Sequence, residues 1–271
     1  MDFFYVFFSF FSNLFMLNFI YGGTMKNKKR IYRNNIIIFS FLFIISVFII
    51  CFIYLNDFYK ANELDIYSFG EYENVTKEEL SDGTLVYYNN EKDIDTGIIF
   101  YPGGKVEYSA YEPLMEGCAS NGYLCAVVEM PFNLAIFDID KADDIKNKYD
   151  NDKSWYIGGH SLGGSMAASY LESNHEDYTG LVLLGSYSTV DLSNTSLKVL
   201  SIYGSNDKVL DIDKYNKYKR NLPRDLEEHI ILGGNHAYFG VYGEQDGDGK
   251  SLITNNEQIN LTIDLMATLM G

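Results

Sequence analysis

Six short apolar runs, separated by amphipathic or polar stretches, divide the chain from residue 97 onward. The runs lack strict alternation of apolar and polar residues, which indicates parallel strands buried on both faces. Strands that alternate with helices predict an α/β fold with a mostly parallel, helix-covered sheet. The expected strands are 97–101, 123–129, 155–159, 180–186, 198–204 and 227–232, with edge strands near 65–73 and 84–88. The expected helices are 107–121, 138–149, 161–173, 211–221 and 257–270.

The stretch WYIGGHSLGGSMAASY, residues 155–170, places one serine between glycines where an expected strand meets an expected helix. Residues 159–163, GHSLG, match the pattern G-x-S-x-G, in which a sharp strand-to-helix turn exposes a nucleophilic serine. Glycine at both ends of the pattern removes side chains that would collide across the turn. Ser161 is therefore a candidate nucleophile, and the alternative is a serine that only caps the helix.

A serine hydroxyl is a weak nucleophile unless a base takes its proton and a carboxylate orients that base. Asp207, in SIYGSNDKVLD, follows one expected strand, and His236, in IILGGNHAYFG, follows the next. Both positions lie with Ser161 at the carboxyl edge of the sheet, where open α/β sheets form their ligand sites. The competing acids are Asp191, Asp211 and Asp213, and the histidines that we interpret as structural are His160, His175 and His229.

An oxyanion formed during acyl transfer needs two N–H donors, one after the nucleophile and one in the loop after an early strand. Leu162 follows Ser161 and supplies the first amide. The loop in FYPGGKVEY supplies the second, because Pro102 fixes a turn there and two glycines let the backbone approach a substrate oxygen. The candidates for this second amide are Gly104 and Lys105, and the sequence does not choose between them.

The GHSLGG turn, the YPGG loop, YGSND and GGNH together resemble the α/β-hydrolase superfamily, over roughly residues 85 to 271. Met130-Pro131 is similar to a segment of small bacterial hydrolases in the dienelactone-hydrolase-like group. The resemblance implies an acyl-transfer site of serine, histidine and aspartate that needs no cofactor. Dienelactone hydrolase itself has cysteine where this chain has Ser161, so its particular substrate is not implied.

We expect a serine hydrolase that cleaves a carboxylic ester of a small or lipid-like acyl substrate. Superfamily members include esterases, peptidases, acyltransferases and non-catalytic proteins, so the fold alone does not define the reaction. One alternative is acyl transfer to a cell-surface acceptor, and the other is a catalytically idle surface binding module. Only about a dozen residues separate the strands ending near Ser186 and starting at Lys198, so little or no cap domain is expected over the site.

Residues 36–55 form about twenty consecutive, mostly apolar positions without a charge, enough to cross a membrane as a helix. Basic residues precede this run and acidic residues follow it, which predicts a single span of the cell membrane with the later residues outside the cytoplasm. Residues 1–24 indicate either a second membrane helix or untranslated sequence before a true start at Met25. The expected organisation is a leader (1–35), an anchor (36–55), a stalk with an edge strand (56–84) and the hydrolase domain (85–271).

The formal net charge of −16 argues against a nucleic-acid partner, because binding to phosphates requires clustered basic residues. Cys118 and Cys125 are interpreted as two semi-buried thiols, although a location outside the cytoplasm would permit a bridge. Asp246 and Asp248 form a D-x-D arrangement that hints at calcium. Lys250 and Ser251 occupy positions where a calcium loop needs an oxygen ligand and a glycine, so we interpret this segment as a polar loop near the site.

Overall fold

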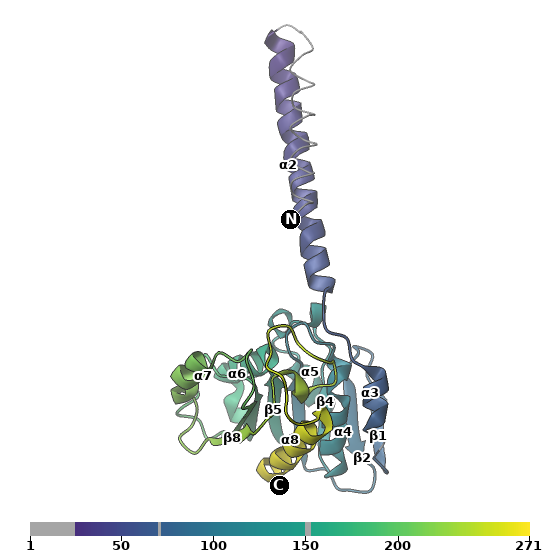
Figure 1. The fold of residues 1–271 in the computed structure, drawn as a ribbon, viewed down its shortest axis with the longest axis vertical. Coiled ribbons are helices and arrows are strands. Elements are labelled where there is room, and N and C mark those ends of the chain that lie inside the picture. The colour runs from purple at the N-terminus through teal and green to yellow at the C-terminus, as the bar shows by residue number, and fades with distance from the viewer. Residues whose placement is uncertain (1–24, 70–71, 150–152) are drawn as a thin grey trace. The chain divides into compact units, whose positions relative to one another are not determined.

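The computed structural model describes residues 25–69, 72–149 and 153–271 (Figure 1). The chain divides into two compact units between Leu55 and Asn56. The predictions for residues 1–24, a second membrane helix or an untranslated leader, lie outside the described residues.

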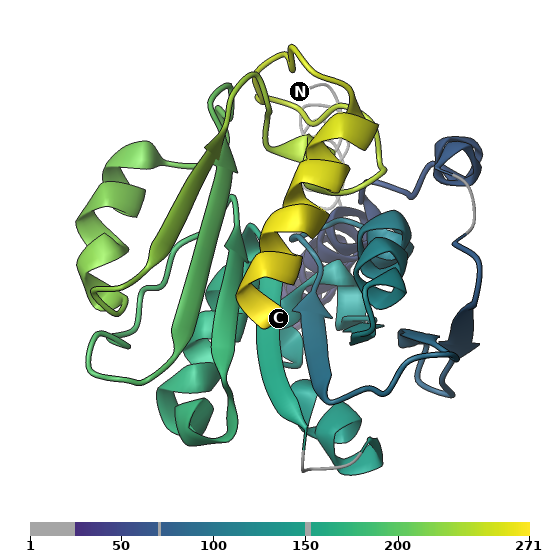
Figure 2. The ribbon, with the colours of Figure 1, turned by 90° about the horizontal axis from the view of Figure 1, so that it is seen from below.

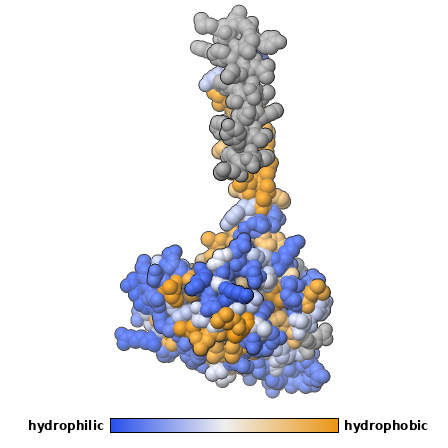
Figure 3. Space-filling view, in the orientation of Figure 1, coloured by the Kyte–Doolittle hydropathy of each residue, from blue (hydrophilic) through white to orange (hydrophobic). Residues whose placement is uncertain are grey.

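The first unit contains one long apolar helix, α2 (Met25–Asn56). Its part from Tyr32 to Asn56 is long and apolar enough to cross a membrane, as the sequence predicted for 36–55. The large apolar side chains of this part are exposed: Phe41 and Phe48 have 62% and 71% of their surface accessible. The helix therefore differs from a core helix, whose apolar side would be covered. In Figure 3, its described and visible part is mostly hydrophobic, whereas the visible surface of the second unit is mostly hydrophilic.

In the described part of the second unit, eight strands form one sheet in the order β1-β2-β4-β3-β5-β6-β7-β8. Strands β3 to β8 are parallel, and β1 and β2 add an antiparallel edge. This sheet is mostly parallel, as predicted. The strands are β1 (Val75–Glu79), β2 (Leu85–Asn89), β3 (Thr96–Tyr101), β4 (Leu124–Val127), β5 (Ser154–His160), β6 (Gly180–Leu184), β7 (Lys198–Gly204) and β8 (Glu227–Ile231).

Helices cover both faces of the sheet (Figure 2), so successive residues of a central strand are buried on opposite sides. Phe100 of β3 packs in the core shared with α4 and α8, whereas its neighbour Ile99 packs in the core shared with α5 and α6. The helices are α3 (Glu63–Ser68), α4 (Glu112–Ser120), α5 (Ala142–Lys148), α6 (Leu162–Asn174), α7 (Ile212–Tyr218) and α8 (Asn255–Met270). The 3-10 turns are η1 (Tyr108–Tyr111), η2 (Pro131–Asn133), η3 (Ala135–Phe137), η4 (His175–Asp177), η5 (Lys219–Asn221) and η6 (Ala237–Phe239).

The prediction of an edge strand near residues 65–73 is wrong. Helix α3 occupies the first part of this range, because Asn62 caps it by accepting a hydrogen bond from the Asp65 amide (3.4 Å). Acidic residues in the first turn also favour a helix N-terminus. The edge strand is β1 instead, and it depends on pairing with β2, which no local pattern reveals.

Two smaller predictions concern the connection after β6 and the soluble cysteines. The connection between Leu184 and Lys198 contains neither helix nor strand, so no cap domain is inserted there, as expected. Cys118 and Cys125 are free thiols and completely buried, rather than semi-buried as predicted.

Candidate active site

Ser161 occupies the turn between β5 and α6 with an unusual backbone conformation, φ 52° and ψ −120°. A non-glycine residue at positive φ is uncommon, and such strain gathers at functional sites. The Ser161 amide donates to the Leu184 carbonyl oxygen (2.9 Å), which holds the turn against β6. The side chain makes no capping hydrogen bond to the helix. This geometry favours a candidate nucleophile over a helix cap.

Glycines on both sides of the serine let the turn close. A Cβ atom at Gly159 would lie 2.6 Å from the backbone of Gly163 and Gly164, and one at Gly163 would lie 2.3 Å from the Tyr101 and Pro102 carbonyl oxygens. These distances are shorter than any real carbon contact, and backbone atoms cannot move away as a flexible side chain does. The spacing of glycine around the serine is therefore a steric requirement of this turn.

Asp207 and His236 come together at the carboxyl edge of the sheet. His236 Nδ1 lies 2.8 Å from Asp207 Oδ2, and both side chains are 1% exposed. The second oxygen, Oδ1, accepts hydrogen bonds from the Val209 and Leu210 amides at 2.9 and 2.8 Å. These amides fix the carboxylate, so it is positioned to hold one tautomer and one orientation of the imidazole.

The competing acids are engaged elsewhere. Asp191 accepts hydrogen bonds from the amide and hydroxyl of Ser193 at 3.0 and 2.6 Å. Asp211 caps α7 through the Lys214 amide (3.0 Å) and pairs with the Lys214 ammonium group (3.1 Å). Asp213 lies in the first turn of α7. Of the four acids considered, only Asp207 contacts His236.

Ser161 and His236 line one pocket of about 320 Å³, between the start of α6 and the loops after β6 and β7. His236 Nε2, the nitrogen opposite to the one that contacts Asp207, is buried and has no hydrogen-bond partner among the described residues. A buried nitrogen without a hydrogen-bond partner lowers the stability of the fold. A base that takes the proton of a serine, in contrast, needs such a free nitrogen.

Gly185, just after β6, makes room for this pair. Its φ of +53° is left-handed, and a Cβ atom there would lie 2.9 Å from His236 Nδ1 and 3.3 Å from Asp207 Oδ2. Any larger residue would push against the imidazole at the atom that Asp207 holds. Gly185 was not among the predicted site residues, although Gly185-Ser186 after an apolar run is a turn signal in the sequence.

Asp248 connects the loops that carry Asp207 and His236. Its Oδ1 accepts from the Lys208 amide (3.2 Å) and the Gly249 amide (2.7 Å), and its Oδ2 accepts from the Ala237 amide (2.9 Å). Within the described residues, no group of three or more His, Cys, Asp or Glu side chains is arranged to hold a metal ion. Asp248 thus connects the two loops through hydrogen bonds to backbone amides.

The loop after β3 distinguishes the two candidates for the second oxyanion donor. The Lys105 amide donates to the Asn133 carbonyl oxygen (2.7 Å), so it is used within the protein. Gly104 lies beside the residue after the nucleophile: a Cβ atom on Gly104 would be 2.9 Å from Leu162 Cδ2. This arrangement favours Gly104, together with the Leu162 amide at the start of α6, as the donor pair.

Tyr111 and His160 form a buried contact that sequence analysis missed. The Tyr111 hydroxyl lies 2.7 Å from His160 Nδ1 and accepts a hydrogen bond from the Gly103 amide (3.0 Å). The His160 ring also packs against His236, with 4.4 Å between the ring centroids. Burial, and then the charge of neighbouring His236, lower the pKa of His160 well below its ordinary value. His160 is thus a neutral spacer between the turn and His236.

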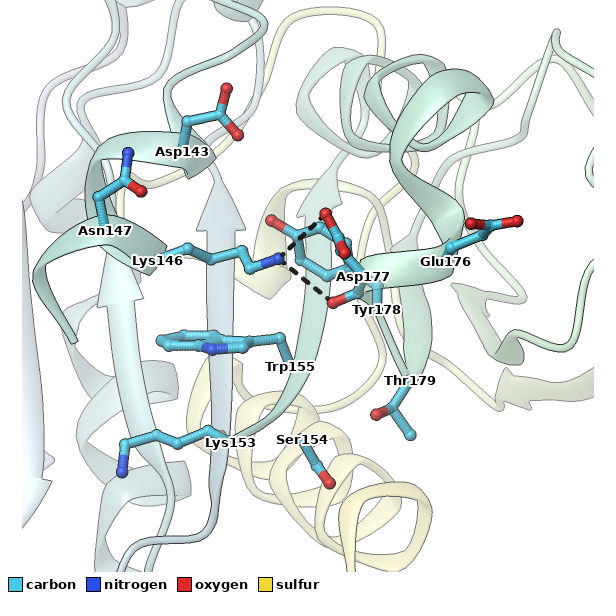
Figure 4. A pocket seen from close by; sticks show the side chains of 10 residues that line it. All are labelled: Asp143, Lys146, Asn147, Lys153, Ser154, Trp155, Glu176, Asp177, Tyr178 and Thr179. Carbon is cyan, nitrogen blue, oxygen red and sulfur yellow. Dashed lines mark hydrogen bonds and ion pairs between the residues drawn. The ribbon is translucent and has the colours of Figure 1, made fainter. Parts of the chain in front are cut away.

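A larger pocket, of about 760 Å³, lies at the opposite edge of the sheet, where β5 and β6 begin (Figure 4). Lys146 extends across it toward Asp177, and its Nζ lies 3.6 Å from the carboxylate and 3.4 Å from the backbone carbonyl oxygen of Asp177. None of the site residues predicted from sequence lines this pocket. Its volume therefore does not make it the better candidate for the chemistry.

The fold and the turn at Ser161 define a class of α/β proteins with a half-buried serine in a strained turn at the carboxyl edge of a mostly parallel sheet. The family model described as the alpha/beta hydrolase family matches residues 97–260, and the chain belongs to this family. Function in this family is generally hydrolytic. No curated protein matches the chain.

Proposed function

We propose that this chain is a serine hydrolase that cleaves a carboxylic ester through a covalent acyl-enzyme. The observation that carries the proposal is the 2.8 Å contact between His236 and Asp207, beside a pocket shared with the strained Ser161. A nucleophile, a base and an orienting carboxylate are the three roles that this chemistry requires.

In the first half-reaction, Ser161 Oγ attacks the ester carbonyl carbon while His236 Nε2 takes the hydroxyl proton. The carbonyl oxygen becomes an oxyanion, which the amides of Leu162 and Gly104 stabilise. Collapse of the tetrahedral intermediate breaks the bond to the leaving alkoxide, and His236 returns the proton to it as alcohol. Asp207 orients the imidazole and stabilises its protonated form.

In the second half-reaction, a water molecule attacks the acyl carbon of the ester on Ser161. His236 takes one water proton and delivers it to Ser161 Oγ as the bond to the acyl group breaks. The products are the free acid and the restored serine. No cofactor is needed for either half. Acyl transfer to a cell-surface acceptor would differ only in that an acceptor alcohol replaces the water.

We further propose that α2 anchors the protein in the cell membrane as a single span and that the catalytic unit lies outside the cytoplasm. The length and exposure of α2 support the span. Basic residues before the apolar run, among them Lys26, Lys28 and Arg33, support the orientation. Protease added to intact protoplasts should then degrade the catalytic unit, and full protection would reverse the orientation.

The decisive experiment combines fluorophosphonate labelling with hydrolysis of a series of esters of increasing acyl length. The native chain should be labelled at Ser161 and hydrolyse at least one ester. Ser161→Ala should lose both, and His236→Ala should be nearly as severe. The double variant should be little worse, because the residues act as one unit.

Asp207→Asn should keep the fold but lower turnover by about 10⁴-fold, as expected when the imidazole holds the wrong tautomer. Asp191→Asn is the matched control and should retain native turnover. Labelling without ester hydrolysis would favour acyl transfer, whereas a folded native chain that is neither labelled nor active would make this a binding module and overturn the proposal.

A further inference from the structure

Three large apolar side chains are exposed at the carboxyl edge of the sheet, in the two turns that follow β4. Phe132, Ile136 and Phe137, here called the apolar ridge, have 51%, 60% and 56% of their surface accessible. The rings of Phe132 and Phe137 meet edge to face, with 5.9 Å between their centroids. Single exposed apolar residues are ordinary, but a cluster of three within six residues marks an interaction surface.

The backbone of the ridge is strained at Phe132, whose ring is exposed. Phe132 and Asn133 both have φ of 55°, the left-handed conformation that bulky side chains avoid. The turn is held by hydrogen bonds from the Asn133 amide to the Met130 carbonyl oxygen (2.9 Å) and from the Leu134 amide to that of Pro131 (3.1 Å). Backbone strain and an exposed aromatic ring both lower the stability of the fold, so their combination indicates a role in binding.

The ridge adjoins the loop that carries the candidate oxyanion donor. The Asn133 carbonyl oxygen accepts from the Lys105 amide (2.7 Å), and Leu134 Cδ2 would lie 3.7 Å from a Cβ atom on Gly104. The loop with Gly104 and Lys105 is thus bonded directly to the segment that presents the ridge. A surface that binds the ridge would therefore lie beside the loop of the candidate oxyanion donor.

The chain enters the second unit at this same loop. The Tyr59 amide donates to the Lys105 carbonyl oxygen (2.8 Å), and the Glu107 amide donates to the Tyr59 carbonyl oxygen (2.9 Å). Only two residues separate Tyr59 from Asn56, the last residue of α2. A fully extended chain over three residue steps spans about 11 Å, so chain connectivity alone keeps Tyr59 within that distance of Asn56.

We infer that the apolar ridge docks on the surface of the lipid bilayer that holds α2 and that the ester substrate enters the site from this bilayer. The short connection from Asn56 to Tyr59 favours a membrane as the binding partner of the ridge, because a bilayer that accepts α2 lies within reach of it. Phenylalanine and isoleucine suit the boundary between headgroups and acyl chains. Entry of the substrate from the bilayer rests on the proposed hydrolase function, whereas docking of the ridge does not.

The net charge of the chain bears on the kind of lipid surface. With −16 overall, and with Asp138 and Asp140 directly after the ridge, the protein has no electrostatic attraction to anionic headgroups. Docking is therefore driven by burial of apolar surface and by the anchor. It should be at least as strong on vesicles of neutral phosphatidylcholine as on vesicles that contain anionic lipid, which repel a negatively charged protein.

The test uses the full chain in phosphatidylcholine vesicles whose acyl chains carry bromine, which quenches tryptophan within contact distance. Phe137→Trp places a reporter on the ridge. Glu176→Trp is the matched control, because Glu176 is exposed in η4, just before β6 and at the opposite edge. The native tryptophan, Trp155, is buried and supplies the same baseline in every sample.

The expected result is a blue shift and a loss of the added emission for Phe137→Trp and not for Glu176→Trp, at every ratio of protein to lipid. Equal quenching at the two positions, or none at Phe137→Trp, would overturn the docking. A blue shift of Phe137→Trp that grows with protein density and is insensitive to bromine would instead mean that the ridge contacts a second copy, which also overturns it.

Entry of the substrate from the bilayer is tested separately, by measuring ester turnover. The double variant Phe132→Ser and Phe137→Ser should lower turnover of a long-chain ester dissolved in the vesicles relative to turnover of a water-soluble short ester. The control is Leu261→Ser, an exposed apolar position on α8, which should leave that ratio unchanged. An unchanged ratio in the ridge variant would overturn entry from the bilayer. Absence of hydrolysis of both esters by the native chain would instead overturn the proposed function, while the quenching result would still stand.

Discussion

The hydroxyl of Tyr111 lies 2.7 Å from Nδ1 of His160, although the two residues are 49 positions apart. The same hydroxyl accepts the Gly103 amide, so one buried side chain joins the turn at Ser161 to the loop of the candidate oxyanion donor. Burial raises the pKa of the Tyr111 hydroxyl far above its usual range, so this group remains a neutral hydrogen-bonding partner. Tyr111 is a positioning residue, since it acts through groups that would contact the substrate.

Tyr111→Phe tests this role. Removing the hydroxyl frees both the Gly103 amide and His160 Nδ1, so the loop and the turn should lose their fixed spacing. We expect kcat to fall by roughly 10- to 100-fold, because small misplacements in a reacting site have large effects, with KM much less affected. Tyr156→Phe is the matched control: its buried hydroxyl donates to the Leu269 carbonyl oxygen (3.2 Å), away from the site. Equal loss of kcat in both variants would mean that Tyr111 has only a structural role.

Gly185→Ala should disable the site by steric pressure on His236. The added methyl group would lie 2.9 Å from the Nδ1 atom that contacts Asp207, so ester hydrolysis should fall sharply. Left-handed backbone alone costs alanine about 1–2 kcal/mol of stability. Gly243→Ala isolates that cost, because Gly243 has φ of +84° and nothing within 4 Å of its Cβ position. Both variants should lose stability in urea unfolding, and only Gly185→Ala should lose activity; a native turnover in Gly185→Ala would contradict the geometry.

Asp248→Ala should lower kcat by separating the loops that carry Asp207 and His236. Three amides would lose their acceptor. The exposed Lys208 amide can bond to water instead, whereas the part-buried Ala237 and Gly249 amides would be left unsatisfied, at a cost of up to about 1–3 kcal/mol each. Asp246→Ala is the control, since Asp246 shares the D-x-D segment without these bonds. A chelator should leave the native activity unchanged, because Asp248 acts through backbone amides. Loss of activity with EDTA that calcium restores would contradict this explanation.

The pH dependence of stability should report on His160. Because burial lowers its pKa, the unfolded chain binds a proton near the ordinary value of about 6.5 while the folded chain does not. Stability from this group is therefore complete above about pH 6.5 and is lost below it, by about 1.4 kcal/mol per pH unit, until the folded histidine titrates. In His160→Gln the urea midpoint should fall less steeply between about pH 6.5 and 5. The fluorescence of Trp155 monitors unfolding, and parallel slopes would refute the prediction.

Features encoded by neighbouring residues were predictable from the sequence. The six central strands followed from short apolar runs without alternation, because strands buried on both faces need apolar residues throughout. The apolar helix followed from its length and lack of charge. The prediction of an edge strand near residues 65–73 was wrong. The segment after Asn62 is a capped helix, and the edge strand is β1, which forms through its pairing with β2.

The candidate site also has features that the sequence predicted and features that only the structure revealed. The sequence indicated that Ser161, Asp207 and His236 come from loops at one edge of the sheet, since parallel strands bring their carboxyl ends together. It left Gly104 and Lys105 as equal oxyanion donors, and only the bond from the Lys105 amide to Asn133 distinguishes them.

By itself, the sequence determined the α/β class, the long apolar helix and the glycine-framed turn at Ser161. These depend on periodicity, length and local sterics. Only the tertiary structure decided that Tyr111 joins His160 to Gly103, that Gly185 must lack a side chain, and that Tyr59 and the apolar ridge meet the same loop. Such contacts depend on how strands align and how helices pack across the sheet, so residues distant in the chain become neighbours without any local signal.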